Sequence, residues 1–183
     1  MTKKQQYIDR FWLVFKYALC SVFIVFIIRG FILIPVPVEG NSMESILKQG
    51  DMVVMEKFST IKRFDVVVFQ LADGTIYIKR VIGLPGETIS YENDQLRVNG
   101  KRVKEPFLTK NIKTDHESLP YTTNFTLDEL INQTKLPENS YFVLGDNRRV
   151  SKDSRSFGTI SQEDILGKAR FVYYPLHEIK WIS

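Results

Sequence analysis

Cysteine and histidine are scarce in this sequence, and their scarcity excludes several kinds of site. The 183 residues include one cysteine, Cys20, which rules out an internal disulfide framework and a multi-cysteine zinc site. The two histidines, His116 and His177, form no HExxH or similar ligand spacing, and the phosphate-binding patterns GxGxxG and GxxxxGK do not occur. A GxSxG elbow is missing as well, which disfavours a Ser-His-Asp hydrolase of that type. We therefore expect neither a metal nor a cofactor.

Excess charge is also lacking once the first 34 residues are set aside. These residues carry five basic side chains and one acidic side chain, which account for the whole net charge of +4. The rest of the chain holds 20 basic and 20 acidic residues and is therefore neutral. Because nucleic-acid binding depends mainly on a positive surface that meets phosphates, we expect no nucleic-acid partner.

One long apolar run stands near the N-terminus, at residues 11–34, and is interrupted only by Lys16 and Arg29 near its ends. As a helix rising about 1.5 Å per residue, it is long enough to cross the roughly 30 Å of hydrocarbon in a bilayer. A cleaved signal peptide would end in small residues, whereas this run ends in the proline-rich segment 34–38, and a buried core helix would not be apolar all round. We therefore predict a permanent membrane anchor over residues 11–34.

Basic residues gather on the N-terminal side of this run, at Lys3, Lys4, Arg10 and Lys16. Positive charge marks the cytoplasmic side of a membrane span. We expect residues 1–10 in the cytoplasm and a single-pass protein of the cell membrane, with its folded part on the extracellular face.

Beyond residue 35 the pattern is typical of β structure. Five segments are rich in Val, Ile and aromatic residues and are separated by turn residues: 51–56, 64–70, 75–82, 141–144 and 165–174. A more polar stretch lies between them, and Thr126 with Glu129 forms a capping box that predicts one short helix there. We predict a mainly β protein, with a core formed by residues 35–91 and 140–183 and a smaller β and loop subdomain inserted at 92–139.

Three polar segments stand out against this pattern. Gly40 and Asn41 permit a sharp turn that would expose the Ser42 hydroxyl. Lys79 lies between bulky neighbours on one face of a predicted strand, which makes it a candidate for burial. The loop 145–158 is dense in Asp, Ser and Arg. Each segment alone has an ordinary alternative: a serine that caps a turn, a lysine that reaches solvent, and a solvated loop.

In combination with the anchor, Ser42-Met43, the strand segment 63–69, the lysine segment 79–86 and the loop 145–158 resemble the boxes of a known family. The chain resembles the bacterial type I signal peptidases, which are membrane-bound serine proteases with a Ser-Lys dyad. It is most similar to the small single-span form of Gram-positive bacteria. The resemblance spans nearly the whole chain, and it implies the family fold, a mostly β catalytic core with a smaller insertion.

The resemblance also implies a role for individual residues, with Ser42 as the nucleophile and Lys79 as its base. Three polar residues of the loop are implied to support them: Ser151 through a hydrogen bond to the lysine, and Asp153 with Arg155 as a structural ion pair. Three apolar residues are implied to line a shallow substrate pocket: Val36, Val38 and Ile78.

The chemistry of such a dyad follows from general acid-base principles. A free lysine, with a pKa of about 10.4, is protonated at neutral pH, but burial can lower that value by several units. A neutral Lys79 could then deprotonate Ser42, which would attack the scissile carbonyl and form an acyl-enzyme. We expect a membrane-anchored serine endopeptidase that removes N-terminal signal peptides from secreted preproteins and cleaves after small, A-x-A-like residues. Its expected partners are the preproteins and the lipid bilayer, and the secretion machinery is a further candidate.

The chain departs from the family pattern at three places. The serine box commonly continues Met-x-Pro-Thr-Leu, whereas residues 43–47 read MESIL, and Phe64 stands where Gly is common. Gly40 replaces a serine that donates to the oxyanion in some members, so we expect that donor to be the Ser42 N–H. Two alternatives remain: a membrane-tethered homologue that binds preproteins without cutting them, and a self-cleaving repressor, which would carry a DNA-binding domain in place of the apolar run.

Overall fold

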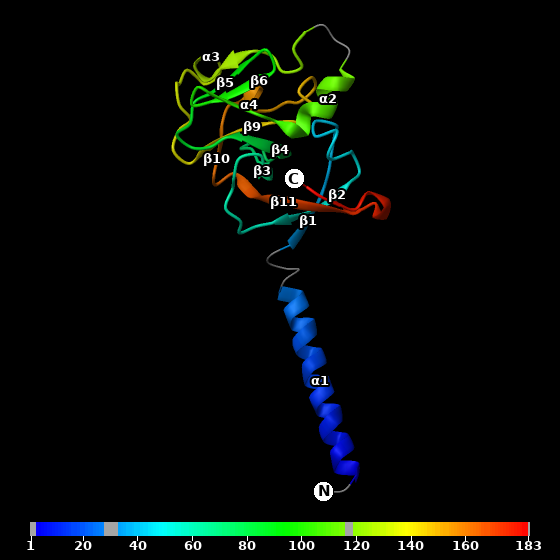
Figure 1. Ribbon diagram of the computed structural model, residues 1–183. Coiled ribbons are helices and arrows are strands. Elements are labelled where there is room, and N and C mark those ends of the chain that lie inside the picture. Colours follow the sequence, from blue (N-terminus) through cyan, green and yellow to red (C-terminus); the bar gives the residue numbers. More distant parts are fainter. Residues whose placement is uncertain (1–2, 28–32, 116–118, 183) are drawn as a thin grey trace.

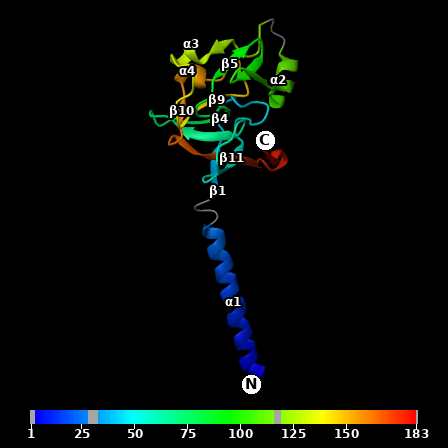
Figure 2. The same cartoon turned by 60° about the vertical axis from the view of Figure 1, so that its left-hand side comes forward.

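The computed structural model describes residues 3–27, 33–115 and 119–182. Helix α1 (Lys3–Ile27) projects away from a β-rich body in both views (Figures 1 and 2), and its residues 4–26 are exposed. No helix within the described ranges combines the length and the hydropathy that a membrane crossing requires. The predicted anchor, 11–34, runs past the end of α1 through residues 28–32, which lie outside the described residues.

The described residues form two antiparallel sheets, which confirms the predicted mainly β class, and the larger sheet contains eight strands. Seven of them follow one another across the sheet, and the eighth pairs with the far part of the long strand β11. In spatial order they are β1 (Leu33–Pro37), β2 (Met52–Glu56), β11 (Ile165–Tyr174), β3 (Val66–Gln70), β4 (Ile76–Gly83), β9 (Ser140–Leu144) and β10 (Ile160–Ser161), with β12 (Lys180–Trp181) beside β11.

The smaller sheet forms most of an inserted subdomain, which lies at the end of the β-rich body farther from α1 (Figure 1). Its strands, in spatial order, are β7 (Lys101–Val103), β6 (Gln95–Val98), β5 (Ile89–Glu92) and β8 (Phe125–Thr126). Three short helices accompany it: η2 (Pro106–Leu108), α2 (Thr109–Thr114) and α3 (Leu127–Ile131). The remaining short helices, α4 (Ser154–Phe157) and η3 (Leu176–Glu178), follow β9 and β11.

The boundary of the insertion differs from the predicted one. Strand β5 begins at Ile89 and pairs with β6 and β8 of the smaller sheet, although the predicted boundary assigned residues up to 91 to the core. The reason is that Ile89 and Tyr91 bury their side chains in the apolar cluster of the smaller sheet. The predicted capping box is present, because the Thr126 hydroxyl accepts from the Glu129 amide at the start of α3 and the Glu129 carboxylate accepts from the Thr126 amide.

Strands β3 and β4 lie in the middle of the larger sheet and are covered on both faces. Val66 and Val68 of β3 belong to one apolar cluster, and Val67 and Phe69 belong to another. Lys79 of β4 stands directly opposite Val67. Since residues opposite each other in a sheet share a face, the lysine starts out toward a buried apolar cluster rather than toward solvent.

Candidate active site

Ser42 lies in a tight turn that follows the β1 strand and is anchored by its apolar neighbours. The Glu44 amide donates to the Asn41 carbonyl at 3.1 Å, and the Leu47 amide donates to the Met43 carbonyl at 2.9 Å. Met43 and Leu47 are buried in the core beneath. Ser42 itself stays partly exposed, so the turn presents its hydroxyl as the sequence predicts.

Lys79 reaches this hydroxyl from the neighbouring wall of the site. Its Nζ lies 2.6 Å from Ser42 Oγ and donates to the Ile78 carbonyl at 3.2 Å. The lysine is only 3% exposed. Burial lowers the pKa of Lys79 to about 8, against the opposing effect of the Asp153 and Asp146 carboxylates. The structure thus brings the two predicted catalytic side chains into contact, with the amine largely removed from water.

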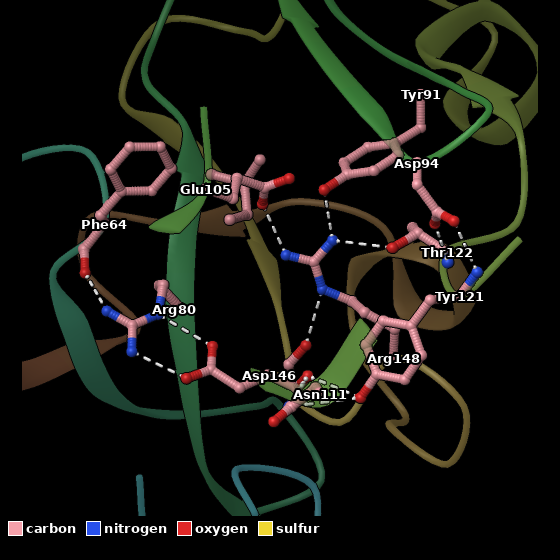
Figure 3. A network of polar contacts seen from close by, with 12 residues as sticks. Phe64, Arg80, Tyr91, Asp94, Glu105, Asn111, Tyr121, Thr122, Asp146 and Arg148 are labelled. Atoms are coloured by element: carbon pink, nitrogen blue, oxygen red, sulfur yellow. Dashed lines mark hydrogen bonds and ion pairs between the residues drawn. The ribbon is translucent and has the colours of Figure 1, made fainter. Parts of the chain in front are cut away.

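The next residue of β4, Arg80, points to the other face and is fully paired (Figure 3). Its guanidinium binds both carboxylate oxygens of Asp146, at 2.8 and 2.7 Å, and donates to the Phe64 carbonyl at 2.8 Å. The Phe107 ring lies 4.1 Å from its central carbon. The ion pair is bidentate and buried, so the Asp146 carboxylate is engaged by Arg80 on the far side of the strand from Lys79.

The loop that follows β9 packs directly against the nucleophile turn. The Asn147 amide donates to the Ser42 carbonyl at 3.0 Å. At Gly145, an added Cβ would lie 2.6 Å from the Ser42 carbonyl oxygen and 2.2 Å from Ser151 Oγ, so no larger residue fits there without a shift. The ion pair implied between Asp153 and Arg155 is present at 2.8 Å, and the Asp153 carboxylate also accepts from the Gly145 amide at 3.0 Å.

The hydrogen bond implied between Ser151 and Lys79 is absent from this structure. Ser151 Oγ is buried and has no hydrogen-bond partner within the described chain. The Lys79 amine instead forms hydrogen bonds with Ser42 Oγ and the Ile78 carbonyl, and the Ser151 side chain packs against Gly145. The supporting role of Ser151 remains a prediction.

Arg148 is buried at the centre of a second hydrogen-bond network (Figure 3). Its guanidinium donates to the Gly145 carbonyl at 2.9 Å, to the Tyr91 hydroxyl at 2.6 Å and to the Glu105 carboxylate at 2.7 Å. Burial raises the pKa of Glu105, while the charge of Arg148 opposes that rise. Nothing local in the sequence marks Glu105 or Tyr91 as partners of the loop, because both belong to the inserted subdomain.

A cleft of about 630 Å³ opens beside the dyad. The three predicted pocket residues, Val36, Val38 and Ile78, line it together with Ser42 and Lys79. The strands on its two walls have open edges as far as the described residues show: there, β1 pairs with β2 alone, and β4 pairs with β9 only from Arg80 onward. The cleft therefore suits an extended peptide. No three His, Cys, Asp or Glu side chains gather as metal ligands would anywhere in the described ranges.

The departures from the family pattern have structural counterparts. Ser45 has φ of 120°, a conformation that proline, fixed near −65°, cannot adopt, so the turn after the nucleophile differs from one built on proline. Phe64 has φ of 70°, in the left-handed region where glycine is favoured. Its ring packs edge-on against Phe107 of the insertion at 5.2 Å, which compensates for the backbone conformation.

Comparisons with known proteins give matches over most of the chain. A model of the family described as "Signal peptidase, peptidase S26" matches residues 11–174. The chain is 44% identical over 162 residues to signal peptidase I V of Bacillus subtilis, which covers 86% of this chain and 95% of that protein. It is 41% identical over 167 residues to signal peptidase IB of Staphylococcus aureus, which covers 86% of each.

A solved structure is similar as well. The crystal structure of a signal peptidase I from Enterococcus faecalis matches with a TM-score of 0.58 and 40% identity, and the match covers 60% of this chain and 97% of that one. The family expected from the sequence is therefore confirmed. The chain belongs to the signal peptidase family, peptidase S26, and is an enzyme of the signal peptidase I type.

Proposed function

We propose that this chain removes signal peptides from secreted preproteins with Ser42 as the nucleophile and Lys79 as the general base. The observation that carries the proposal is the 2.6 Å contact between Lys79 Nζ and Ser42 Oγ at a buried amine whose pKa is lowered to about 8. At pH 7 roughly a tenth of the molecules then hold a neutral amine, against well under a thousandth for a free lysine.

The dyad performs acyl transfer in two halves. Neutral Lys79 takes the proton of Ser42 Oγ as the oxygen attacks the scissile carbonyl carbon, and the ammonium returns that proton to the leaving amine as the peptide C–N bond breaks. Lys79 is then neutral again and takes a proton from the water that attacks the acyl carbon, and its ammonium returns that proton to Ser42 Oγ as the ester C–O bond breaks. The Ser42 amide donates none of the hydrogen bonds found within the described residues, which leaves it available for the oxyanion.

Substrate choice follows from the shape of the cleft. An extended peptide can pair with the open edge of β4 through main-chain hydrogen bonds, beside the wall that leads from β1 to the nucleophile turn. Val36, Val38 and Ile78 line this cleft, and an apolar pocket formed by these branched side chains would favour small residues before the cut.

Anchoring in the membrane is a further part of the proposal. The side chains of α1 are apolar over most of residues 11–26 and exposed, with Lys16 as the single charge in that segment. The basic residues Lys3, Lys4 and Arg10 precede it, which favours a cytoplasmic N-terminus and an extracellular active site. A site just beyond the bilayer would meet preproteins where their signal-peptide helices end.

The first prediction concerns the dyad. Ser42→Ala should lower kcat for cleavage of a preprotein about a thousandfold or more, because the attacking oxygen is removed. Lys79→Arg should do the same, because a guanidinium stays protonated. Gel-based cleavage by the full chain in detergent measures both effects.

Ser45→Ala is the matched control, since Ser45 is exposed and lies in the same turn, and it should keep cleavage near the wild-type rate. A second substrate, with tryptophan in place of alanine immediately before the cut, tests the pocket and should be cleaved at least tenfold more slowly. Undiminished cleavage by Ser42→Ala would refute the dyad, and cleavage by neither wild type nor variant would favour a protein that only binds preproteins.

The second prediction concerns pH. Because the base must be neutral, kcat/KM should rise with pH and level off above an apparent pKa of about 8. The substrate should carry no group near the cut that titrates between about pH 6 and pH 10. A profile that stays flat through this range would show that Lys79 does not act as the base.

The third prediction is that Lys79→Met stabilises the protein. The folded-state pKa of about 8 lies below the ordinary 10.5, so the buried ammonium opposes folding wherever the amine is protonated in both states. At pH 7 the variant should gain on the order of 1–3 kcal/mol in free energy of unfolding, and the gain should fade as the pH rises from about 8 to about 10.5.

Urea unfolding across this pH range measures the difference, with Lys57→Met, an exposed lysine, as the control. A gain that is equal at all pH values would show that packing, and not the charge of Lys79, is responsible.

The fourth prediction concerns the anchor. The full chain should stay with membranes after alkaline carbonate washing, and Leu19→Lys combined with Phe23→Lys should be released, because each charge at the centre of a span costs about 3 kcal/mol. Phe58→Lys, at an exposed position in the β-rich body, should stay with the membranes. Release of the wild-type chain would overturn anchoring.

A further inference from the structure

One peptide group links the inserted subdomain to the nucleophile. The carbonyl oxygen of Asp146 accepts hydrogen bonds from the Tyr121 hydroxyl and from Asn111 Nδ2, each at 3.1 Å (Figure 3). The N–H of the same peptide group belongs to Asn147, and it donates to the Ser42 carbonyl at 3.0 Å. Because a peptide group is planar, holding its oxygen on one side also fixes the direction of its N–H on the other.

Asn111 also approaches the nucleophile turn itself. Its Nδ2 lies 3.4 Å from the Glu44 carbonyl, two residues beyond Ser42, and 3.3 Å from the Tyr121 hydroxyl. On the other side of the serine, Asn147 Nδ2 donates to the Asn41 carbonyl at 3.3 Å. The carbonyls before, at and after the nucleophile are therefore all held from outside the turn.

Tyr121, one of the two donors of the inserted subdomain, is itself held in place. The Asp94 carboxylate accepts from the backbone amides of Tyr121 and Thr122, at 3.0 and 2.7 Å, and Tyr121 is 7% exposed. The Thr122 hydroxyl in turn accepts from Arg148 at 3.1 Å. Tyr121 therefore meets Asp146 from a rigid frame, and a displacement of that frame would be transmitted to the loop.

We propose that the inserted subdomain positions the nucleophile, with Tyr121 and Asn111 orienting the Asp146–Asn147 peptide so that its N–H holds the Ser42 carbonyl. Neither side chain contacts Ser42 Oγ or Lys79 Nζ among the hydrogen bonds of the structure, so both are positioning residues. The inference rests on the proposed function. It assigns a task to the insertion, which is to keep the Ser42 backbone placed so that its hydroxyl stays within reach of the amine.

The test compares three variants of the full chain in detergent. Tyr121→Phe removes only a hydroxyl, and Asn111→Ala removes only the side-chain donor on α2. Each should lower kcat about threefold to tenfold with KM changed less than about twofold, because the loss affects placement of the nucleophile rather than peptide binding. The double variant should lose more than the product of the two single losses, since the remaining donor partly compensates in each single variant.

Thr126→Ala is the matched control, because it removes the helix cap of α3 in the same subdomain and touches neither the loop nor the nucleophile turn. It should lower stability while kcat stays at the wild-type value. A second readout does not depend on activity: hydrogen exchange at the Asn147 amide should speed up in Tyr121→Phe and stay unchanged in Thr126→Ala.

Each outcome is informative. Wild-type cleavage that is lost in Ser42→Ala establishes the function independently, and the Tyr121 and Asn111 variants then decide the inference. If the wild type does not cleave, the proposed function fails and the exchange of the Asn147 amide still tests the positioning contact. Three results would overturn the inference. They are an unchanged kcat in the double variant, a loss of kcat in the double variant no greater than the loss in Thr126→Ala when the two variants are equally stable, and an unchanged exchange rate of the Asn147 amide in Tyr121→Phe.

Discussion

The contact between the Lys79 amine and the Ser42 hydroxyl depends on burying a lysine without giving it a carboxylate of its own. Lys79 and Arg80, which are neighbours on β4, are both buried, but their side chains have different partners. Arg80 is neutralised by a bidentate carboxylate, whereas the Lys79 amine contacts a hydroxyl, a backbone carbonyl and the face of the Tyr77 ring. A carboxylate at contact distance would raise the pKa of the amine and prevent it from acting as a base near neutral pH. Strand alternation makes the separation possible, because consecutive side chains leave on opposite faces.

The two nearest acids are kept from the lysine by arginine. Asp146 is held by Arg80, and Asp153 is held by Arg155 and by the Gly145 amide. Both carboxylates still raise the pKa of Lys79 through space, but burial outweighs them and the result is about 8. The pKa of Lys79 therefore reflects two opposing effects, burial of the amine and the charges of two carboxylates that bind arginines rather than the amine. Arg80 and Arg155 therefore hold the two acids in contacts of their own, away from direct contact with the Lys79 amine.

Local patterns predicted much of this arrangement, and contacts distant in sequence account for what they missed. The strands, the capping box at Thr126 and the dyad follow from residue type and spacing, or from boxes that resemble a family. Glu105, Tyr91, Asn111 and Tyr121 were not predicted, because a polar residue in an irregular segment carries no sign of which loop it will meet. The start of the insertion was misplaced for a similar reason, since Ile89 and Tyr91 are as apolar as core residues, and only pairing shows which sheet they join.

The inserted subdomain is linked to the surroundings of Lys79 and of Ser42 by separate contacts. Phe107 covers the guanidinium of Arg80, the residue next to Lys79, and packs against Phe64, whose carbonyl that guanidinium also binds. Tyr121 and Asn111 hold the peptide that meets the Ser42 carbonyl. A left-handed backbone at Phe64 is a cost that glycine would avoid, but glycine would leave Phe107 without its ring contact. The Phe64 ring is therefore part of the link between the insertion and strand β4. The two sets of contacts meet at Asp146, which binds Arg80 through its side chain and Tyr121 through its backbone carbonyl.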